Sequence, residues 1–99
     1  MRITAYQRQV ILESSNEIFG DGVEVRLFGS RMNDSKRGGD IDLFVNLPFV
    51  EPLKMAKSLR FSSMICRKLG DVIDVDVVIK DSASPAALIY QEGMKGVSL

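Results

Sequence analysis

The chain has 99 residues, and its 13 basic and 13 acidic side chains leave no formal net charge at pH 7. A chain of this length has room for one small domain, which we expect to span residues 1–99. The balanced charge argues against a strongly basic surface, so we expect no direct nucleic-acid binding. The absence of histidine excludes a Ser-His-Asp triad, Cys-His catalysis and zinc sites built on imidazole.

Membrane and secreted proteins have marks that this sequence lacks. No stretch approaches the roughly 20 apolar residues that a membrane-spanning helix needs. The first eight residues do not form the apolar centre of a signal peptide. The single cysteine, Cys66, cannot form an internal disulfide. We therefore expect a cytoplasmic protein that does not bind membranes.

The N-terminal part predicts an amphipathic helix followed by a strand. Thr4 and Gln7 have the spacing of a capping box, and apolar residues then recur at helical spacing to about residue 19. Gly20-Asp21-Gly22 ends this helix. Residues 23–28 alternate between two faces, which predicts a strand with one buried face.

The turn after this first strand is a candidate phosphate site. Gly29 allows a ligand to approach the backbone closely, and Ser30 offers a hydroxyl and an amide at an expected helix start. Taken alone, the pair reads as an ordinary turn. Arg31 has the fixed charge and donor fork that bind phosphate, while a solvated surface charge is the default role of such a residue.

Residues 40–47 predict a second strand that carries two carboxylates. Successive side chains of a strand alternate, so Asp40 and Asp42 project from one face and the apolar residues from the other. Aspartate is disfavoured within strands, so two of them need a reason. Mg²⁺ supplies one, because it is typically held by one or two carboxylates together with substrate phosphates. The alternative is a solvent-exposed pair at a sheet edge.

The remainder predicts a helix, a strand and a short helix. Residues 52–69 are the first of these, with a predicted buried stripe of Met55, Ala56, Leu59, Ser63, Cys66 and Leu69. Residues 71–80 alternate in the same way as the second strand, and Asp74 and Asp76 share its polar face. Ser84 is the predicted N-cap and Pro85 the first residue of a last helix, which continues over residues 86–92.

This order of elements predicts a small α/β (α+β) domain, with a mixed β-sheet and helices packed against it. The Gly29-Ser30 pair, followed after a short loop by Asp40-Ile41-Asp42-Leu43, resembles the signature of the polymerase-beta-type nucleotidyltransferase superfamily. A chain this short is most similar to the minimal nucleotidyltransferases (MNT), the antitoxin partners of HEPN toxins. The resemblance covers nearly the whole chain and implies the small nucleotidyltransferase fold.

The resemblance also implies a third carboxylate in a strand that reads hydrophobic-Asp-hydrophobic-hydrophobic. Val75-Asp76-Val77-Val78 matches best, and Asp74 is the reserve candidate because alternation alone cannot separate the two. By this resemblance Asp40, Asp42 and Asp76 are the catalytic residues and hold Mg²⁺ in a two-metal site. Gly29, Ser30 and Arg31 bind the nucleotide.

The activity implied is Mg²⁺-dependent transfer of AMP from ATP to a hydroxyl, and the implied acceptor is a tyrosine of a HEPN-domain toxin. Two alternatives stay open. One is a non-catalytic antitoxin that neutralises its partner by contact. The other is a small-molecule, antibiotic-type nucleotidyltransferase, which would have to build its acceptor pocket as a homo-oligomer.

Overall fold

The computed structural model describes residues 3–29, 41–70, 74–85 and 87–99. Within them the elements follow the predicted order, with a short strand added at the C-terminal end. The helices are α1 (Ala5–Phe19), α2 (Lys54–Lys68) and α3 (Leu88–Met94), and the strands are β1 (Glu24–Phe28), β2 (Ile41–Asn46), β3 (Val75–Lys80) and β4 (Val97–Ser98). None of these helices is both long and apolar enough to cross a membrane.

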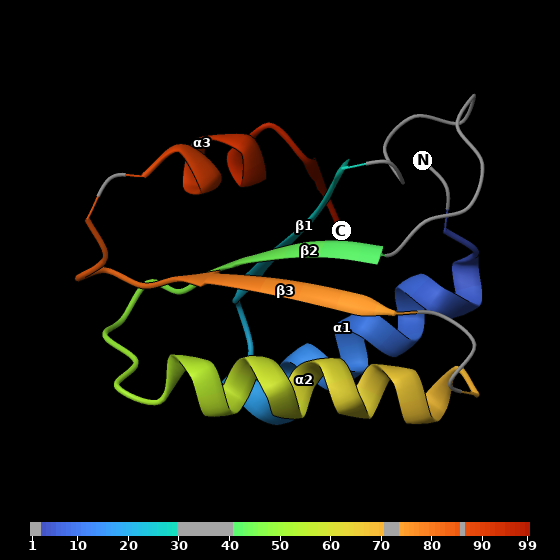
Figure 1. Cartoon of the computed structure of the whole chain (residues 1–99). Helices are drawn as coiled ribbons and strands as arrows, with labels where there is room; N and C mark the ends of the chain where they lie inside the picture. The colour runs from blue at the N-terminus through green and yellow to red at the C-terminus, as the bar shows by residue number, and fades with distance from the viewer. Residues whose placement is uncertain (1–2, 30–40, 71–73, 86) are drawn as a thin grey trace.

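The four strands form one mixed sheet in the order β3-β2-β1-β4. β1 runs antiparallel to β2 and β4, while β2 and β3 run parallel because α2 carries the chain back between them. Figure 1 shows α1 and α2 on one side of the sheet and α3 on the other. The structure is therefore the small α+β fold that the order of elements predicts.

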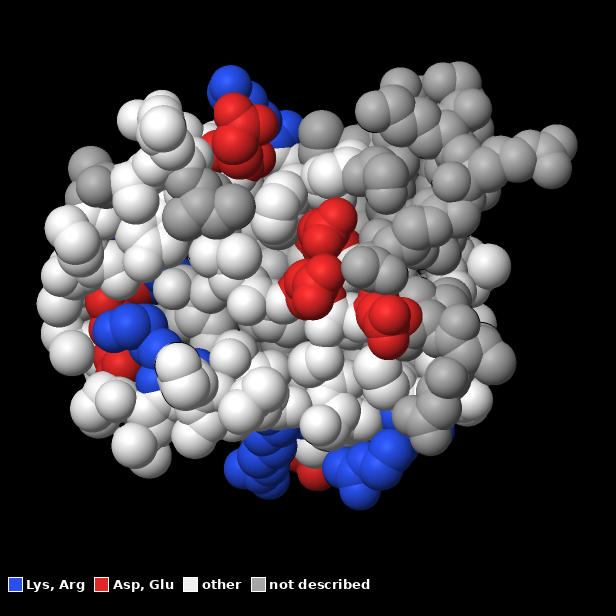
Figure 2. Space-filling view, viewed as in Figure 1, with Lys and Arg blue, Asp and Glu red and all other residues white. Residues whose placement is uncertain are grey.

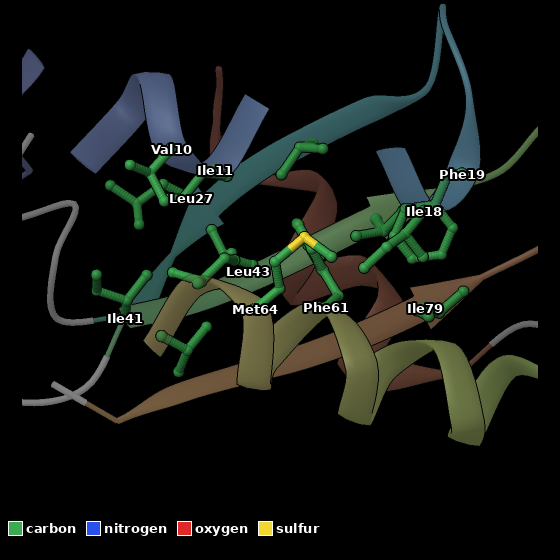
Figure 3. Close-up of a cluster of buried hydrophobic side chains, with 14 of the residues drawn as sticks. Val10, Ile11, Ile18, Phe19, Leu27, Ile41, Leu43, Phe61, Met64 and Ile79 are labelled. Atoms are coloured by element: carbon green, nitrogen blue, oxygen red, sulfur yellow. The ribbon is translucent and has the colours of Figure 1, made fainter. Parts of the chain in front are cut away.

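The main core lies between the sheet and the helices α1 and α2. Leu27 and Leu43 are fully buried on this face of the sheet, as the alternation predicts. Figure 3 shows side chains of both helices meeting them there. Among these, the rings of Phe19 and Phe61 meet edge to face with their centroids 5.4 Å apart. At the start of α1 the capping box is confirmed, because the side chains of Thr4 and Gln7 each accept a backbone N–H of the other.

The opposite face of β2 is covered by α3. Phe44, two residues after Asp42 on this face, is fully buried. The ring of Tyr90 lies against it with the two centroids 6.3 Å apart. Gly93 packs so closely that a Cβ atom there would come within 2.3 Å of the Phe44 ring. α3 therefore covers Phe44 on this face of the sheet and forms a second, smaller apolar contact.

The buried stripe predicted on α2 is wrong for four of its six members: Met55, Ala56, Leu59 and Ser63 are exposed, while Cys66 and Leu69 pack partly buried against the core. Met55 and Leu59 are 78% and 64% exposed. The helix buries a different set, Phe61, Met64 and Ile65. Both sets recur at helical spacing on different sides of the helix, so spacing alone does not decide which one faces the sheet. In the observed orientation of α2, Phe61 makes the edge-to-face contact with Phe19.

The turn after β3 is organised by a buried carboxylate rather than by the predicted helix cap. Asp81 is fully buried and accepts the backbone N–H of Glu51 at 2.8 Å, Lys54 Nζ at 3.0 Å and the Ser84 hydroxyl at 2.8 Å. These hydrogen bonds hold the pKa of the Asp81 carboxyl well below its usual range, and the bond from the Glu51 backbone N–H contributes most. Because Ser84 is bound to Asp81, it does not cap α3, whose N-cap is Ala87.

Candidate functional site

Asp42 and Asp76 lie side by side on neighbouring strands. The parallel register of β2 and β3 pairs these two residues directly, and neighbouring strands are about 4.8 Å apart. Both side chains belong to the face of the sheet that α3 partly covers, since Leu43 and Val75 point into the opposite, main core. Figure 2 shows acidic side chains gathered over β2 and β3 in the middle of the view. The fold therefore brings together two of the predicted carboxylates.

Gly29 places the end of β1 directly against Asp42. Its φ of +73° lies in the left-handed region that favours glycine. A Cβ atom at this position would come within 2.3 Å of Asp42 Oδ2. The register of the antiparallel pair β1–β2 agrees, because Phe28 is the partner of Asp42. Glycine is thus required here both by the backbone conformation and by the close approach of the carboxylate.

The strand register also distinguishes the two candidates for the third carboxylate. Asp74 and Asp76 are both exposed, and they project from the same face. The backbone carbonyl of Asp74 accepts the N–H of Ile41 at 3.0 Å, whereas Asp76 is paired with Asp42. Asp76 is therefore the direct neighbour of Asp42, and Asp74 lies one step further along the face.

Three of the predicted site residues, Ser30, Arg31 and Asp40, lie outside the described residues. The geometry of the site is therefore built from Gly29, Asp42 and Asp76. Among the residues that the structure describes, no group of three or more Asp, Glu, Cys or His side chains is placed to hold a metal ion. The donors that are present, two neighbouring carboxylates, still fit Mg²⁺, which takes one or two carboxylates and completes its shell with phosphates and water.

A pocket on the same side of the sheet was not predicted, because the sequence gives little sign of it. It has a volume of about 350 Å³ and lies between the end of β3 and the helix α3, lined by Lys80, Ala87, Tyr90, Gln91 and Met94. Two further hollows lie along α2, one lined in part by Met64 and Arg67 and the other by Met55 and Val77. Tyr90 and Met94 are four residues apart on a helix, and this spacing is the only sign of the pocket in the sequence.

A family model for a nucleotidyltransferase domain matches residues 9–93. This span runs from α1 to α3 and contains β1, β2, β3 and every residue of the candidate site. Comparisons with curated proteins and with solved structures gave no match.

Proposed function

Because the chain belongs to the nucleotidyltransferase domain family, we propose that it transfers AMP from ATP to a hydroxyl group in a Mg²⁺-dependent reaction. The observation that carries this proposal is the direct pairing of Asp42 with Asp76, with Gly29 packed against Asp42. Two carboxylates held this close favour a bound cation, because the cation offsets their mutual repulsion. A carboxylate pair beside a tight glycine turn is suited to binding a cation together with a polyphosphate.

Asp42 and Asp76, together with Asp40 as the sequence predicts, would hold the metal ions. When bound, Mg²⁺ neutralises phosphate oxygens and lowers the pKa of an attacking hydroxyl. Asp76 is the more exposed of the paired carboxylates, so it is the one open to an acceptor. Its role is to orient the acceptor hydroxyl and take up its proton.

The reaction forms one bond and breaks another at the α-phosphorus of ATP. The acceptor oxygen attacks this phosphorus, and the bond to the oxygen that bridges the α- and β-phosphates breaks. Pyrophosphate leaves with that electron pair, and AMP becomes esterified to the acceptor. This mechanism needs accurate positioning and charge stabilisation more than covalent help from the protein.

The β- and γ-phosphates are assigned to the turn after β1. Gly29 has no side chain, and the Asp42 carboxylate lies against it on one side. A glycine at this turn lets a ligand approach the backbone closely. Ser30 and Arg31 would add a hydroxyl and a fixed positive charge. Their part in binding rests on the sequence alone.

The acceptor that we propose is a tyrosine hydroxyl of a HEPN-type toxin, which makes the protein an antitoxin. This choice rests on the resemblance to the minimal nucleotidyltransferases. A contact-only antitoxin and an antibiotic-type enzyme are the alternatives, and the label-transfer experiment below distinguishes all three.

The test follows label from ATP carrying ³²P at the α-phosphate, with Mg²⁺ and the HEPN protein from a neighbouring gene. Label should appear on the toxin with the wild type and be lost with Asp42→Asn. Asp21→Asn is the matched control, because it makes the same chemical change at an exposed turn. A complex without labelling would favour the contact-only antitoxin. Labelling of an aminoglycoside but not of the toxin would favour the antibiotic-type enzyme.

A further inference from the structure

We propose that the pocket between β3 and α3 binds the base of the nucleotide whose phosphates lie at Asp42 and Asp76. The inference rests on the proposed function and adds to it the place where the base is recognised. The pocket is lined by Lys80, Ala87, Tyr90, Gln91 and Met94.

The pocket and the carboxylates share one face of the sheet. Asp42 and Phe44 project from the same side of β2 because they are two residues apart. Phe44 in turn contacts Tyr90, one of the residues that line the pocket. Phe44 itself lies buried under α3, but Val78, between Asp76 and Lys80 on the same face of β3, is only partly buried. A ligand at the carboxylates can therefore reach the pocket over β3, without crossing the sheet.

The direction of the strands gives the spacing between the two sites. The parallel register pairs Asp42 with Asp76 at one end and Asn46 with Lys80 at the other. Four residues of strand separate Asp76 from Lys80, which is about 13 Å at the usual rise per residue. The turn at Gly29 lies at the Asp42 end. Phosphates at that end would leave the nucleoside to extend along β3 toward Lys80.

The chemistry of the lining suits a flat aromatic base. Tyr90 and Met94 supply an aromatic ring and a polarisable thioether, and both groups pack well against a ring system. Lys80 and Gln91 also line the pocket, mainly with the apolar parts of side chains that end in an ammonium and an amide. A mostly apolar pocket of several hundred Å³ with a few polar groups is typical of sites for small ligands.

The distance also argues against the acceptor as the occupant. The acceptor hydroxyl has to meet the α-phosphorus, and in the proposed site this atom lies beside Asp42 and Asp76. A group seated near Lys80 is about 13 Å away along the strand. The pocket is therefore too far away to hold the reacting tyrosine itself, and it is placed for a part of the nucleotide that does not react.

The experiment compares ATP with inorganic tripolyphosphate, both with Mg²⁺, by isothermal titration calorimetry. The two ligands share the phosphate chain, and only ATP has a base. Met94→Glu changes a pocket residue that is 43% exposed, and Leu88→Glu makes the same change in charge on α3 at a residue that is 79% exposed and does not line the pocket. Circular dichroism checks that both variants are folded.

Met94→Glu should weaken ATP binding by up to about tenfold, the upper end of what a lost contact between a thioether and an aromatic ring costs. Tripolyphosphate binding should stay within about twofold of the wild type, since the loss of the contact does not touch the phosphates. Leu88→Glu should leave both affinities unchanged. Gln91→Leu, at an exposed residue, is the second variant and should alter the ratio of ATP to GTP affinity.

Two results would overturn the base site while leaving the phosphate site intact. The first is a wild type that binds ATP no more tightly than tripolyphosphate. The second is a pair of pocket variants, Met94→Glu and Gln91→Leu, that change neither the ATP affinity nor the ATP-to-GTP ratio. A wild type that binds neither ligand would overturn the proposed function and the base site together.

Discussion

Gly29 lies directly against Asp42, and a Cβ atom on Gly29 would come within 2.3 Å of the Asp42 carboxylate. The contact joins the turn that follows β1 to the carboxylate at the start of β2. In the proposed function these two groups bind the phosphates and the metal. Any side chain at position 29 should therefore disturb the site as well as the local backbone.

The first prediction concerns this contact. Gly29→Ala should abolish Mg²⁺-dependent ATP binding, because the new methyl group displaces the Asp42 carboxylate. Gly22→Ala is the matched control: Gly22 has a φ of +79°, similar to the +73° of Gly29, but a Cβ atom added there would meet nothing within 4 Å. Both variants should lose about 1–2 kcal/mol of stability from the left-handed backbone. Only Gly29→Ala should lose ATP binding in calorimetry, and normal binding by this variant would contradict the assignment.

The second prediction separates Asp76 from Asp74. Because Asp76 is paired with Asp42 and Asp74 is not, Asp76→Asn should lower kcat by at least about a hundredfold, the lower end of what removing an acid–base group costs. Asp74→Asn, the same chemical change two residues away on another exposed side chain, should stay within a few-fold of the wild type. The rate of pyrophosphate release from ATP in the presence of the acceptor measures both. The reverse order of effects would make Asp74 the third carboxylate.

The third prediction concerns the stability of the fold against acid. The pKa of Asp81 is held low mainly by the backbone N–H of Glu51 and then by Lys54. The pKa of Glu51 is lowered chiefly by its bond with Lys57, at 2.8 Å. A lowered pKa means that the folded state binds the proton less readily than the unfolded chain does. The stabilisation is therefore complete above the ordinary pKa near 4 and is lost as the pH falls below it.

Asp81→Asn removes the pH dependence of stability that comes from Asp81 and leaves the part that comes from Glu51. The variant should be less stable than the wild type at pH 7, because the charged bonds to Lys54 and the backbone are weakened. The difference in the free energy of unfolding between the two proteins should narrow as the pH falls from about 5 to 2. Urea unfolding at a series of pH values measures it, and a constant difference across that range would exclude this role for Asp81.

The fourth prediction tests the orientation of α2. Phe61→Ala should lower the free energy of unfolding by about 3–5 kcal/mol, because Phe61 is fully buried and its loss leaves a cavity. Leu59→Ala removes a side chain that is 64% exposed, so its effect should be below about 1 kcal/mol. Chemical denaturation of the two variants gives both values. Equal losses of stability in the two variants would mean that α2 presents a different side to the sheet.

Local patterns predicted the elements and the faces of the strands well. Alternation along residues 40–47 placed Leu43 in the core and Asp42 on the opposite face, and the Thr4–Gln7 spacing predicted the cap of α1. These features depend on neighbours in the chain, which the sequence displays directly.

Features that depend on distant partners were harder to predict. Alternation puts Asp74 and Asp76 on one face, and only the pairing of β3 with β2 places Asp76 beside Asp42. The exposed stripe of α2 and the pocket of Tyr90 and Met94 both follow from how helices dock on the sheet. Ser84 has the properties of an N-cap, but the buried Asp81 binds its hydroxyl instead.

The most direct test of the central claim is ATP binding by calorimetry, with and without Mg²⁺, in the wild type and in Asp42→Asn. If Asp42 helps to hold the metal that binds the triphosphate, the wild type should bind ATP only with Mg²⁺, and the folded variant should bind it at least about tenfold more weakly. Equal binding by the two proteins, or binding that does not depend on Mg²⁺, would contradict the role of the Asp42–Asp76 pair in nucleotidyl transfer.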